Sequence, residues 1–234
     1  PCPPGNQNCA GAPYGDNWPA WNADFFAPAA PLLAAAPWVF VRGNHEECQR
    51  FGPGFMRLLS PQSWPQPCAA HLAPYRIPLG DFALMVMDDS DAADTAVDPD
   101  KLPTYEADLV AATAPSPVPV WLVLHRPIWA AISLVANIPA GGNAQIIAAA
   151  QKTMIAKPVT LMLSGHIHTF EILNYSRSGY GGSPPPQIVA GIGGDLQIAA
   201  PANLRGTIFQ GRSGVSVKDG LSVGGFGFLL LTRN

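Results

Sequence analysis

Charged side chains are scarce in this sequence: Asp, Glu, Lys and Arg together make up 12% of its 234 residues, and the net charge is −3. Lys and Arg form no cluster, so the sequence gives little support for binding a nucleic-acid backbone. Long apolar runs are also missing, since none approaches the roughly 20 residues that a membrane-spanning helix needs. We therefore predict neither a nucleic-acid nor a membrane partner. A chain of this length fits one domain, residues 1–234, with a substantial core.

Cysteine is also rare, with four in the whole chain and no CxxC spacing. The four form two local pairs in Pro- and Gly-rich stretches, Cys2 with Cys9 and Cys48 with Cys68. We predict two disulfides with this pairing and hence a secreted or periplasmic protein, although other pairings and buried free thiols are alternatives. No leader peptide precedes Pro1, so we expect that an upstream segment has been removed or omitted.

Three apolar runs end in polar residues that suit a metal site. The runs are Trp38–Val41, Pro119–Leu124 and Val159–Leu163, and they lead into Arg42-Gly43-Asn44-His45-Glu46, His125-Arg126-Pro127 and Ser164-Gly165-His166-Ile167-His168. Four of the five histidines lie in these motifs, whereas histidines placed for packing or solubility would be scattered. Ligands of open α/β sheets bind at the carboxyl ends of strands, so the three runs, taken as buried strands, predict one shared site.

Three motifs follow one another in this order: GNHE, a strand-terminal His before Arg-Pro, and GHxH. Together they resemble the later motifs of the calcineurin-like metallophosphoesterases. That superfamily includes the purple acid phosphatases and the Ser/Thr protein phosphatases. The resemblance covers roughly residues 38–195 and implies an α/β fold, a four-layer α/β/β/α sandwich of two mixed sheets. The pattern of strands alternating with helices, followed by a run of strands, agrees with two packed sheets flanked by helices.

The resemblance also implies a metal-dependent hydrolase of phosphate mono- or diesters. In such enzymes two metal ions about 3.5–4 Å apart clamp the phosphate and turn a bound water into hydroxide. The implied ligands are Asn44, His125 and His166 for one ion and His168 for the other. His45 would assist the leaving-group oxygen, and Arg126 is a weaker candidate for holding phosphate. The metals, Zn, Mn or Fe, and the identity of the small phosphate-ester substrate stay open.

Two motifs of that family are missing upstream of Asn44, an Asp-x-His and a Gly-Asp at a strand end. Gly15-Asp16 offers the dipeptide without a preceding apolar run, so Asp16 is only a candidate for the ligand that bridges the two ions. We expect an N-terminally truncated piece whose sheet is completed by an N-terminal fragment or a second copy. Without that segment we expect one ion, held by Asn44, His125 and His166.

A second class of function fits the missing motifs: a catalytically incomplete, metallophosphoesterase-like binding or scaffold module with at most one metal. The intact GNHE and GHxH motifs argue against it. A serine hydrolase is disfavoured because no Gly-x-Ser-x-Gly elbow occurs.

The remaining pattern predicts further elements. We expect helices over 22–36, 104–112 (with Thr104 as N-cap) and 143–152, one helical turn at 55–59, and strands over 38–42, 82–87, 119–124, 159–163, 187–192, 206–217 and 225–231. The long loop 46–80 is expected to form a wall of the substrate pocket. Asp88, Asp89 and Asp91 are expected at a solvated strand end, with a metal cluster as the alternative, and His71 in an ordinary loop.

Overall fold

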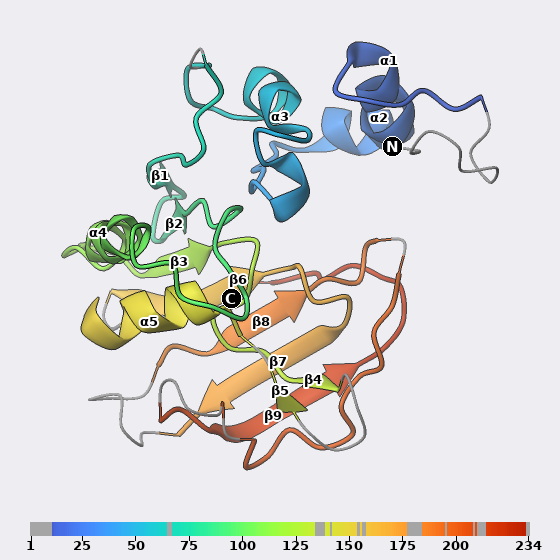
Figure 1. The fold of residues 1–234 in the computed structure, drawn as a ribbon. Coiled ribbons are helices and arrows are strands. Elements are labelled where there is room, and N and C mark those ends of the chain that lie inside the picture. The colour runs from blue at the N-terminus through green and yellow to red at the C-terminus, as the bar shows by residue number, and fades with distance from the viewer. Residues whose placement is uncertain are drawn as a thin grey trace.

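The computed structural model of the protein describes residues 11–64, 67–133, 139–140, 142–153, 155, 158–176, 184–194, 196–207, 209 and 214–232. Its centre is a seven-stranded mixed sheet with the order β1-β2-β3-β6-β8-β7-β9 (Figure 1). The strands are β1 Tyr75–Pro78, β2 Ala83–Val86, β3 Val120–Val123, β6 Val159–Ser164, β7 Phe170–Tyr175, β8 Gln187–Ala190 and β9 Val217–Val223. A separate ribbon pairs β4 Ile132–Ser133 with β5 Pro139–Ala140.

Four central strands run parallel, and this sets the position of the site. β2, β3, β6 and β8 are parallel neighbours, whereas β1, β7 and β9 are antiparallel to the strands beside them. Parallel strands are covered on both faces and are therefore rich in apolar residues, and here Ala83, Leu122 and Met162 are fully buried. Their carboxyl ends meet at one edge of the sheet, which is the edge that His125 and His166 follow.

Helices α4 (Leu102–Ala112) and α5 (Ala144–Thr153) pack against each other beside the sheet (Figure 1). The main core joins their buried faces, including Leu109 and Ile146, to Leu122 of β3, Met162 of β6 and the buried Trp129. Asn143 caps α5, since its Oδ1 accepts a hydrogen bond from the Ile146 amide at 2.8 Å. The loops at the strand ends are thereby held on a rigid scaffold.

The N-terminal part of the chain forms a small helical unit to one side of the sheet (Figure 1). It contains α1 (Trp18–Trp21), a π-helical turn over Asn22–Phe26, α2 (Ala27–Ala35) and α3 (Gly52–Leu58). A minor core gathers around Phe55, Met56 and Leu72. The Cys48–Cys68 disulfide joins this unit to the segment that leads into β1, which confirms that prediction. The predicted Cys2–Cys9 pair lies outside the described residues.

Most predicted helices and strands are confirmed, but four expectations are wrong. Of the predicted strand 206–217, only residues 216–217 pair in the sheet among those that the structure describes, since β9 begins at Val217. Residues 38–42 form no strand, because Trp38 stacks on Phe40 with ring centroids 5.8 Å apart and both contact the N-terminal aromatic residues instead of a partner strand. The last described strand is β9 (Val217–Val223), and residues 225–231 are not a strand. The N-cap of α4 is Lys101, not Thr104, because Pro103 is accommodated in the first turn.

The predicted α/β class is confirmed. The four-layer arrangement of two sheets is compatible with this structure but is not established by it, since the described residues form one large sheet and a short ribbon. Within the described ranges, no helix combines the length and apolar character that a bilayer crossing requires.

Candidate functional site

Three predicted metal ligands converge at the carboxyl edge of the sheet. The Asn44 Oδ1 atom lies 2.9 Å from His125 Nε2, and His166 Nδ1 lies 3.2 Å from the same His125 nitrogen. Asn44 comes from the turn after Gly43, His125 follows β3, and His166 follows β6. The backbone amide of Gly165 also donates to the carbonyl of His125 at 2.9 Å, so the two strand-end loops are directly joined.

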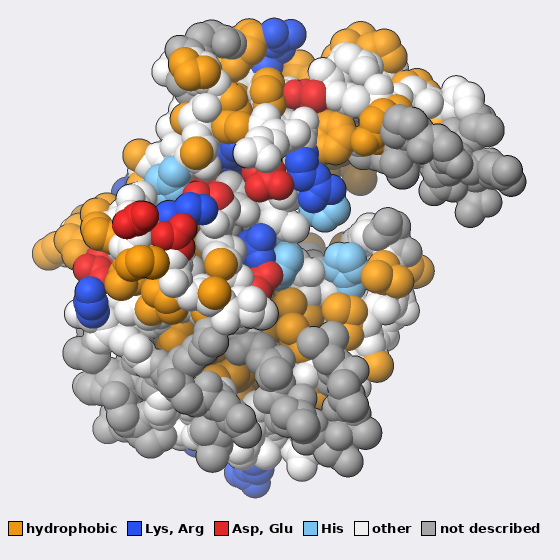
Figure 2. Space-filling view, in the orientation of Figure 1, with side chains coloured by type: hydrophobic (Ala, Val, Ile, Leu, Met, Phe, Trp, Pro, Cys, Tyr) orange, Lys and Arg blue, Asp and Glu red, His pale blue; other side chains and the backbone are white. Residues whose placement is uncertain are grey.

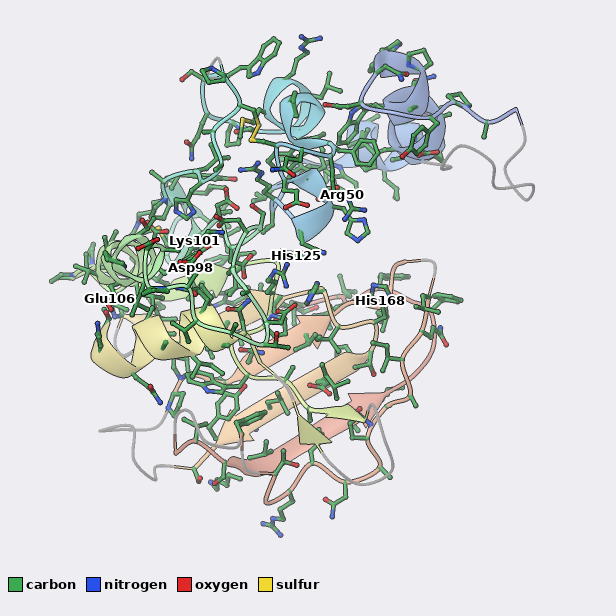
Figure 3. All side chains as sticks on the ribbon, viewed as in Figure 1. Arg50, Asp98, Lys101, Glu106, His125 and His168 are labelled. Atoms are coloured by element: carbon green, nitrogen blue, oxygen red, sulfur yellow. A yellow bond between two sulfur atoms is a disulfide. The ribbon has the colours of Figure 1, made fainter. Side chains whose placement is uncertain are left out.

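Figure 2 shows this region as a hollow between the N-terminal unit and the body that carries the sheet, with histidine side chains on both sides. In Figure 3, His125 and His168 lie on the sheet side and Arg50 lies across the opening. The hollow is therefore lined from both parts of the chain, and a ligand bound there would contact both.

The turn that carries Asn44 is fixed by the buried side chain of Arg42. Its Nε donates to the carbonyl of Glu46 at 2.8 Å, and its Nη1 donates to Asp88 Oδ2 at 3.0 Å. Because Asp88 follows β2, these bonds fasten the Asn44–Glu46 turn to the end of that strand. Gly43 leaves room for this packing, since a Cβ atom there would lie 2.8 Å from Glu46 Oε2 and 3.1 Å from the His125 ring.

His125 and His166 are held by backbone features that place their rings. Asp89 is fully buried and accepts hydrogen bonds from the amides of His125 at 3.0 Å and Arg126 at 2.9 Å. His166 has a φ of 61°, in the left-handed region that a non-glycine residue rarely adopts. Backbone strain of this kind concentrates at functional sites, where the surrounding structure enforces it.

Asp94 holds the far side of the His166 ring. Its Oδ2 lies 3.2 Å from His166 Nε2 and also accepts a hydrogen bond from Arg126 Nη1. Burial alone would raise the pKa of Asp94, but the hydrogen bonds with His166 and Arg126 outweigh it and lower the pKa to about 2. As an ionised acceptor closer to Nε2 (3.2 Å) than Arg126 Nη1 is (3.4 Å), Asp94 favours the His166 tautomer with its proton on Nε2. That tautomer leaves the Nδ1 lone pair directed toward His125 Nε2.

His125 is neutral at ordinary pH. Burial disfavours its charged form, the electrostatic effects of the neighbouring His166 and Arg126 add to this, and the pKa of His125 falls to about 3. A neutral imidazole is the form that can donate a lone pair to a metal ion. No proton therefore has to leave His125 before it can bind a metal ion.

The donor set fits one metal ion. Nitrogen and oxygen ligands about 2.1 Å from a common ion lie roughly 3 Å from one another, which matches the spacings among Asn44, His125 and His166. A second ion has less support. Within the described ranges, no group of three or more His, Cys, Asp or Glu side chains is arranged to hold a metal, and the Asn44 set contains only two such residues.

His168, the predicted ligand of a second ion, follows two residues after His166 at the same edge of the sheet (Figure 3). Its Nδ1 is buried and has no hydrogen-bond partner among the described residues. A Cβ atom on Gly191 would lie 1.9 Å from the carbonyl oxygen of Ile167, so glycine is needed where the end of β8 meets this turn. The structure thus packs the GHxH turn tightly but does not test whether His168 binds metal.

His45 and Arg50 form a second part of the site, on the N-terminal side. Arg50 Nη2 lies 3.0 Å from His45 Nδ1. A guanidinium group can only donate, so Nδ1 is the acceptor and the proton of a neutral His45 ring lies on Nε2. Both side chains are exposed. This arrangement suits a proton donor, although no structural observation tests the predicted catalytic role.

Two predicted site residues have other partners. Both carboxylate oxygens of Asp16 are bound within the N-terminal unit: Oδ1 accepts from the Trp21 indole at 2.7 Å and Oδ2 accepts from the Gly54 amide at 2.8 Å. The guanidinium of Arg126 is engaged by Asp94 and is 11% exposed. Arg126 therefore lies in the site, where it contacts Asp94 next to His166. None of these contacts joins Asp16 to the histidines.

Sequence reasoning missed the supporting residues. Asp88 and Asp89 are buried, so the expectation of a solvated strand end is wrong, because Arg42 and the backbone amides of His125 and Arg126 bind these carboxylates. Asp94 and Arg50 lie in segments without hydrophobic periodicity, and no sequence motif indicates a role for them. His71 contacts Asp108 at 2.7 Å, away from the motif residues.

A mixed sheet with His125 and His166 after two parallel strands, and with Asn44 on a turn beside them, matches a metallophosphoesterase-like protein. The family model for calcineurin-like phosphoesterases matches residues 10–170, and the chain belongs to this family. Among solved structures, a purple acid phosphatase from yellow lupin (Lupinus luteus) seeds matches with a TM-score of 0.51 and 14% identity. The match covers 79% of this chain but only 36% of that one, so this chain spans about a third of its relative. A comparison with curated proteins gave no match.

Proposed function

We propose that this chain hydrolyses phosphate mono- or diesters at a metal site formed by Asn44, His125 and His166. The observation that carries the proposal is the convergence of three donor atoms, with 2.9 and 3.2 Å between neighbours, from segments far apart in the sequence. Family membership supports the same chemistry. A Zn, Mn or Fe ion bound there supplies Lewis acidity toward the phosphate oxygens.

We assign the following roles to the chain's own residues. Asp94 and Asp89 orient His166 and His125, and Arg42 holds the Asn44 turn, so the donors need little reorganisation when an ion binds. His45, with its ring proton on Nε2, donates to the leaving-group oxygen as the ester bond breaks. Arg50, next to His45, supplies positive charge that attracts the phosphate.

A second ion would take His168 together with ligands from a segment that completes the site, an N-terminal fragment or a second copy of the chain. We further propose one domain over residues 1–234 and a secreted or periplasmic location, which the Cys48–Cys68 disulfide supports. The alternative function is a catalytically incomplete scaffold or binding module with at most one metal. The engagement of Asp16, the candidate bridging ligand, by Trp21 and Gly54 favours it.

Kinetics of the His45→Ala variant test the catalytic proposal. We expect the turnover of an aryl phosphate by metal-loaded protein to fall about 100-fold or more, because a general acid is lost while the metal ligands stay. Metal content, measured by atomic spectroscopy, should equal that of the wild type. The Gln49→Ala variant alters an exposed neighbour on the same segment and should behave as wild type.

Loss of metal from His45→Ala would show that His45 is a ligand and not a proton donor. Full metal occupancy with no turnover of any phosphate ester by the wild type would favour the scaffold alternative.

A further inference from the structure

A cavity of about 320 Å³ lies beside His45 in the N-terminal unit. Its walls include Trp21, Asp24, Phe25, His45, Glu46 and Phe51. This volume is at the lower end of the range for small-molecule sites, which are mainly apolar with a few polar groups. None of the metal-ligand assignments uses the cavity, yet it shares His45 with the proposed catalytic site, and Asn44 is the adjacent residue.

The aromatic walls are held rigidly. Trp21 meets Phe51 edge to face, with ring centroids 6.5 Å apart, and Phe25 meets Phe40 in the same way at 5.7 Å. The Trp21 indole is also fastened by its hydrogen bond to Asp16, whose other oxygen accepts from the Gly54 amide. A ring that is fixed before binding loses little entropy when a ligand stacks on it.

Glycine at position 54 is part of this construction. A Cβ atom there would lie 2.0 Å from Asp16 Oδ1 and 2.2 Å from Trp21 Nε1, so any other residue would displace both groups. Both carboxylate oxygens of Asp16 are used in these contacts, so Asp16 positions a wall of this cavity and does not act as a metal ligand.

The charge of the walls selects among ligands. Asp24 and Glu46 are the acidic residues of the lining, and they disfavour an anionic group. The Glu46 carboxylate already accepts a hydrogen bond from the Gly43 amide at 3.1 Å, and burial raises the pKa of Glu46. The acidic residues disfavour an anionic ring, and Arg50, which contacts His45, disfavours a cationic one. An uncharged flat ring fits both, and it can gain about 0.5–1.5 kcal/mol from each aromatic contact.

We infer that this cavity binds the leaving group of the substrate and that the substrate class is phosphate esters of uncharged aromatic alcohols. The inference rests on the proposed function and deepens it. A ring seated against Trp21 and Phe51, which both line the cavity together with His45, places its ester oxygen next to His45, the residue proposed to donate the proton to that oxygen. The phosphate then lies toward Asn44 and the two histidines.

The test compares 2-naphthyl phosphate with methyl phosphate in the Phe51→Ala variant. We expect the ratio of kcat/KM for the two substrates to fall about fivefold to tenfold relative to wild type, because one aromatic contact is lost. The matched control is Phe82→Ala, which removes an aromatic residue that packs on Trp121, outside the cavity lining. Its ratio should equal that of the wild type.

Binding of 2-naphthol to metal-free protein, measured by calorimetry, provides a readout that does not need turnover. Wild type should bind 2-naphthol and Phe51→Ala should bind it at least fivefold more weakly. No hydrolysis of either ester together with intact naphthol binding would refute the proposed function and leave the cavity assignment standing. An unchanged substrate ratio in Phe51→Ala, or no naphthol binding by the wild type, would overturn the inference.

Discussion

At the scale of single residues, the site depends on a few side chains that hold the donors in place. Asn44, His125 and His166 could be predicted from the sequence, because each follows an apolar run in a recognisable motif. Asp94 could not, since it lies in an irregular loop and its role exists only where the folded chain brings it to His166. Asp89 was visible as part of an acidic run, but only the structure shows that it binds two backbone amides.

The Asp94→Asn substitution tests the importance of such support. It keeps the size of the side chain but removes the ionised acceptor that fixes the His166 tautomer, so we expect metal affinity to fall about 10–100-fold. Competition with a chromophoric chelator measures the affinity directly. Asp100→Asn, an exposed change on the following segment, should have the affinity of the wild type. Equal affinities for wild type and Asp94→Asn would show that Asp94 does not position His166.

At the scale of elements, the parallel strands were predictable and the flanking segments were less so. β2, β3 and β6 are short apolar runs, which the sequence shows directly. The apolar pattern of residues 38–42 also predicts a strand. A strand forms only when a neighbouring strand accepts and donates its backbone hydrogen bonds. Here the aromatic side chains of this segment pack on the N-terminal unit instead. β7 was missed because Glu171 interrupts its apolar pattern while being fully buried.

Glu171 makes the stability of β7 dependent on pH. Burial raises the pKa of Glu171 to about 7, because only the Ala131 amide donates to it and its Oε1 has no partner among the described residues. A carboxyl pKa above the unfolded value of 4.5 means that stability is full below about pH 4.5 and declines as pH rises through about 7. The native state therefore carries an unfavourable buried charge at alkaline pH.

We expect Glu171→Gln to stabilise the protein at about pH 8 by up to roughly 3 kcal/mol, since the amide mimics the protonated acid. The difference should close at about pH 4.5, where the wild-type carboxyl is protonated in both states. Denaturant unfolding at the two pH values measures it. A variant that is less stable than wild type at alkaline pH would show that the carboxylate is satisfied in the native state.

At the scale of the whole molecule, contacts between the N-terminal unit and the body that carries the sheet hold the two sides of the hollow. Arg42 binds Asp88 at the end of β2, and His71, which follows the Cys48–Cys68 loop, binds Asp108 of α4. Burial lowers the pKa of His71, but the hydrogen bond and charge of Asp108 exceed that effect and raise it overall. The sequence placed His71 in an ordinary loop and could not show this link.

The His71–Asp108 contact should contribute stability that is full below about pH 6.5 and is lost as pH rises through the raised pKa of the folded state. Asp108→Asn should therefore destabilise the protein more at about pH 6 than at about pH 9, by roughly 1 kcal/mol or less. Thermal unfolding at both pH values measures the difference. Glu106→Gln removes a partly exposed pair with Lys152 that does not involve His71, and its effect should be the same at both pH values. A pH-independent effect of Asp108→Asn would contradict the assignment.

The convergence of Asn44, His125 and His166 on one ion is tested most directly by the metal content of purified protein after equilibration with Zn or Mn, measured by atomic spectroscopy. We predict about one tightly held ion per wild-type chain, retained in His71→Gln and lost in both Asn44→Ala and His125→Ala, since three ligands are needed for tight binding. Wild-type protein without metal, or variants of Asn44 and His125 that hold as much metal as wild type, would contradict this account of the site.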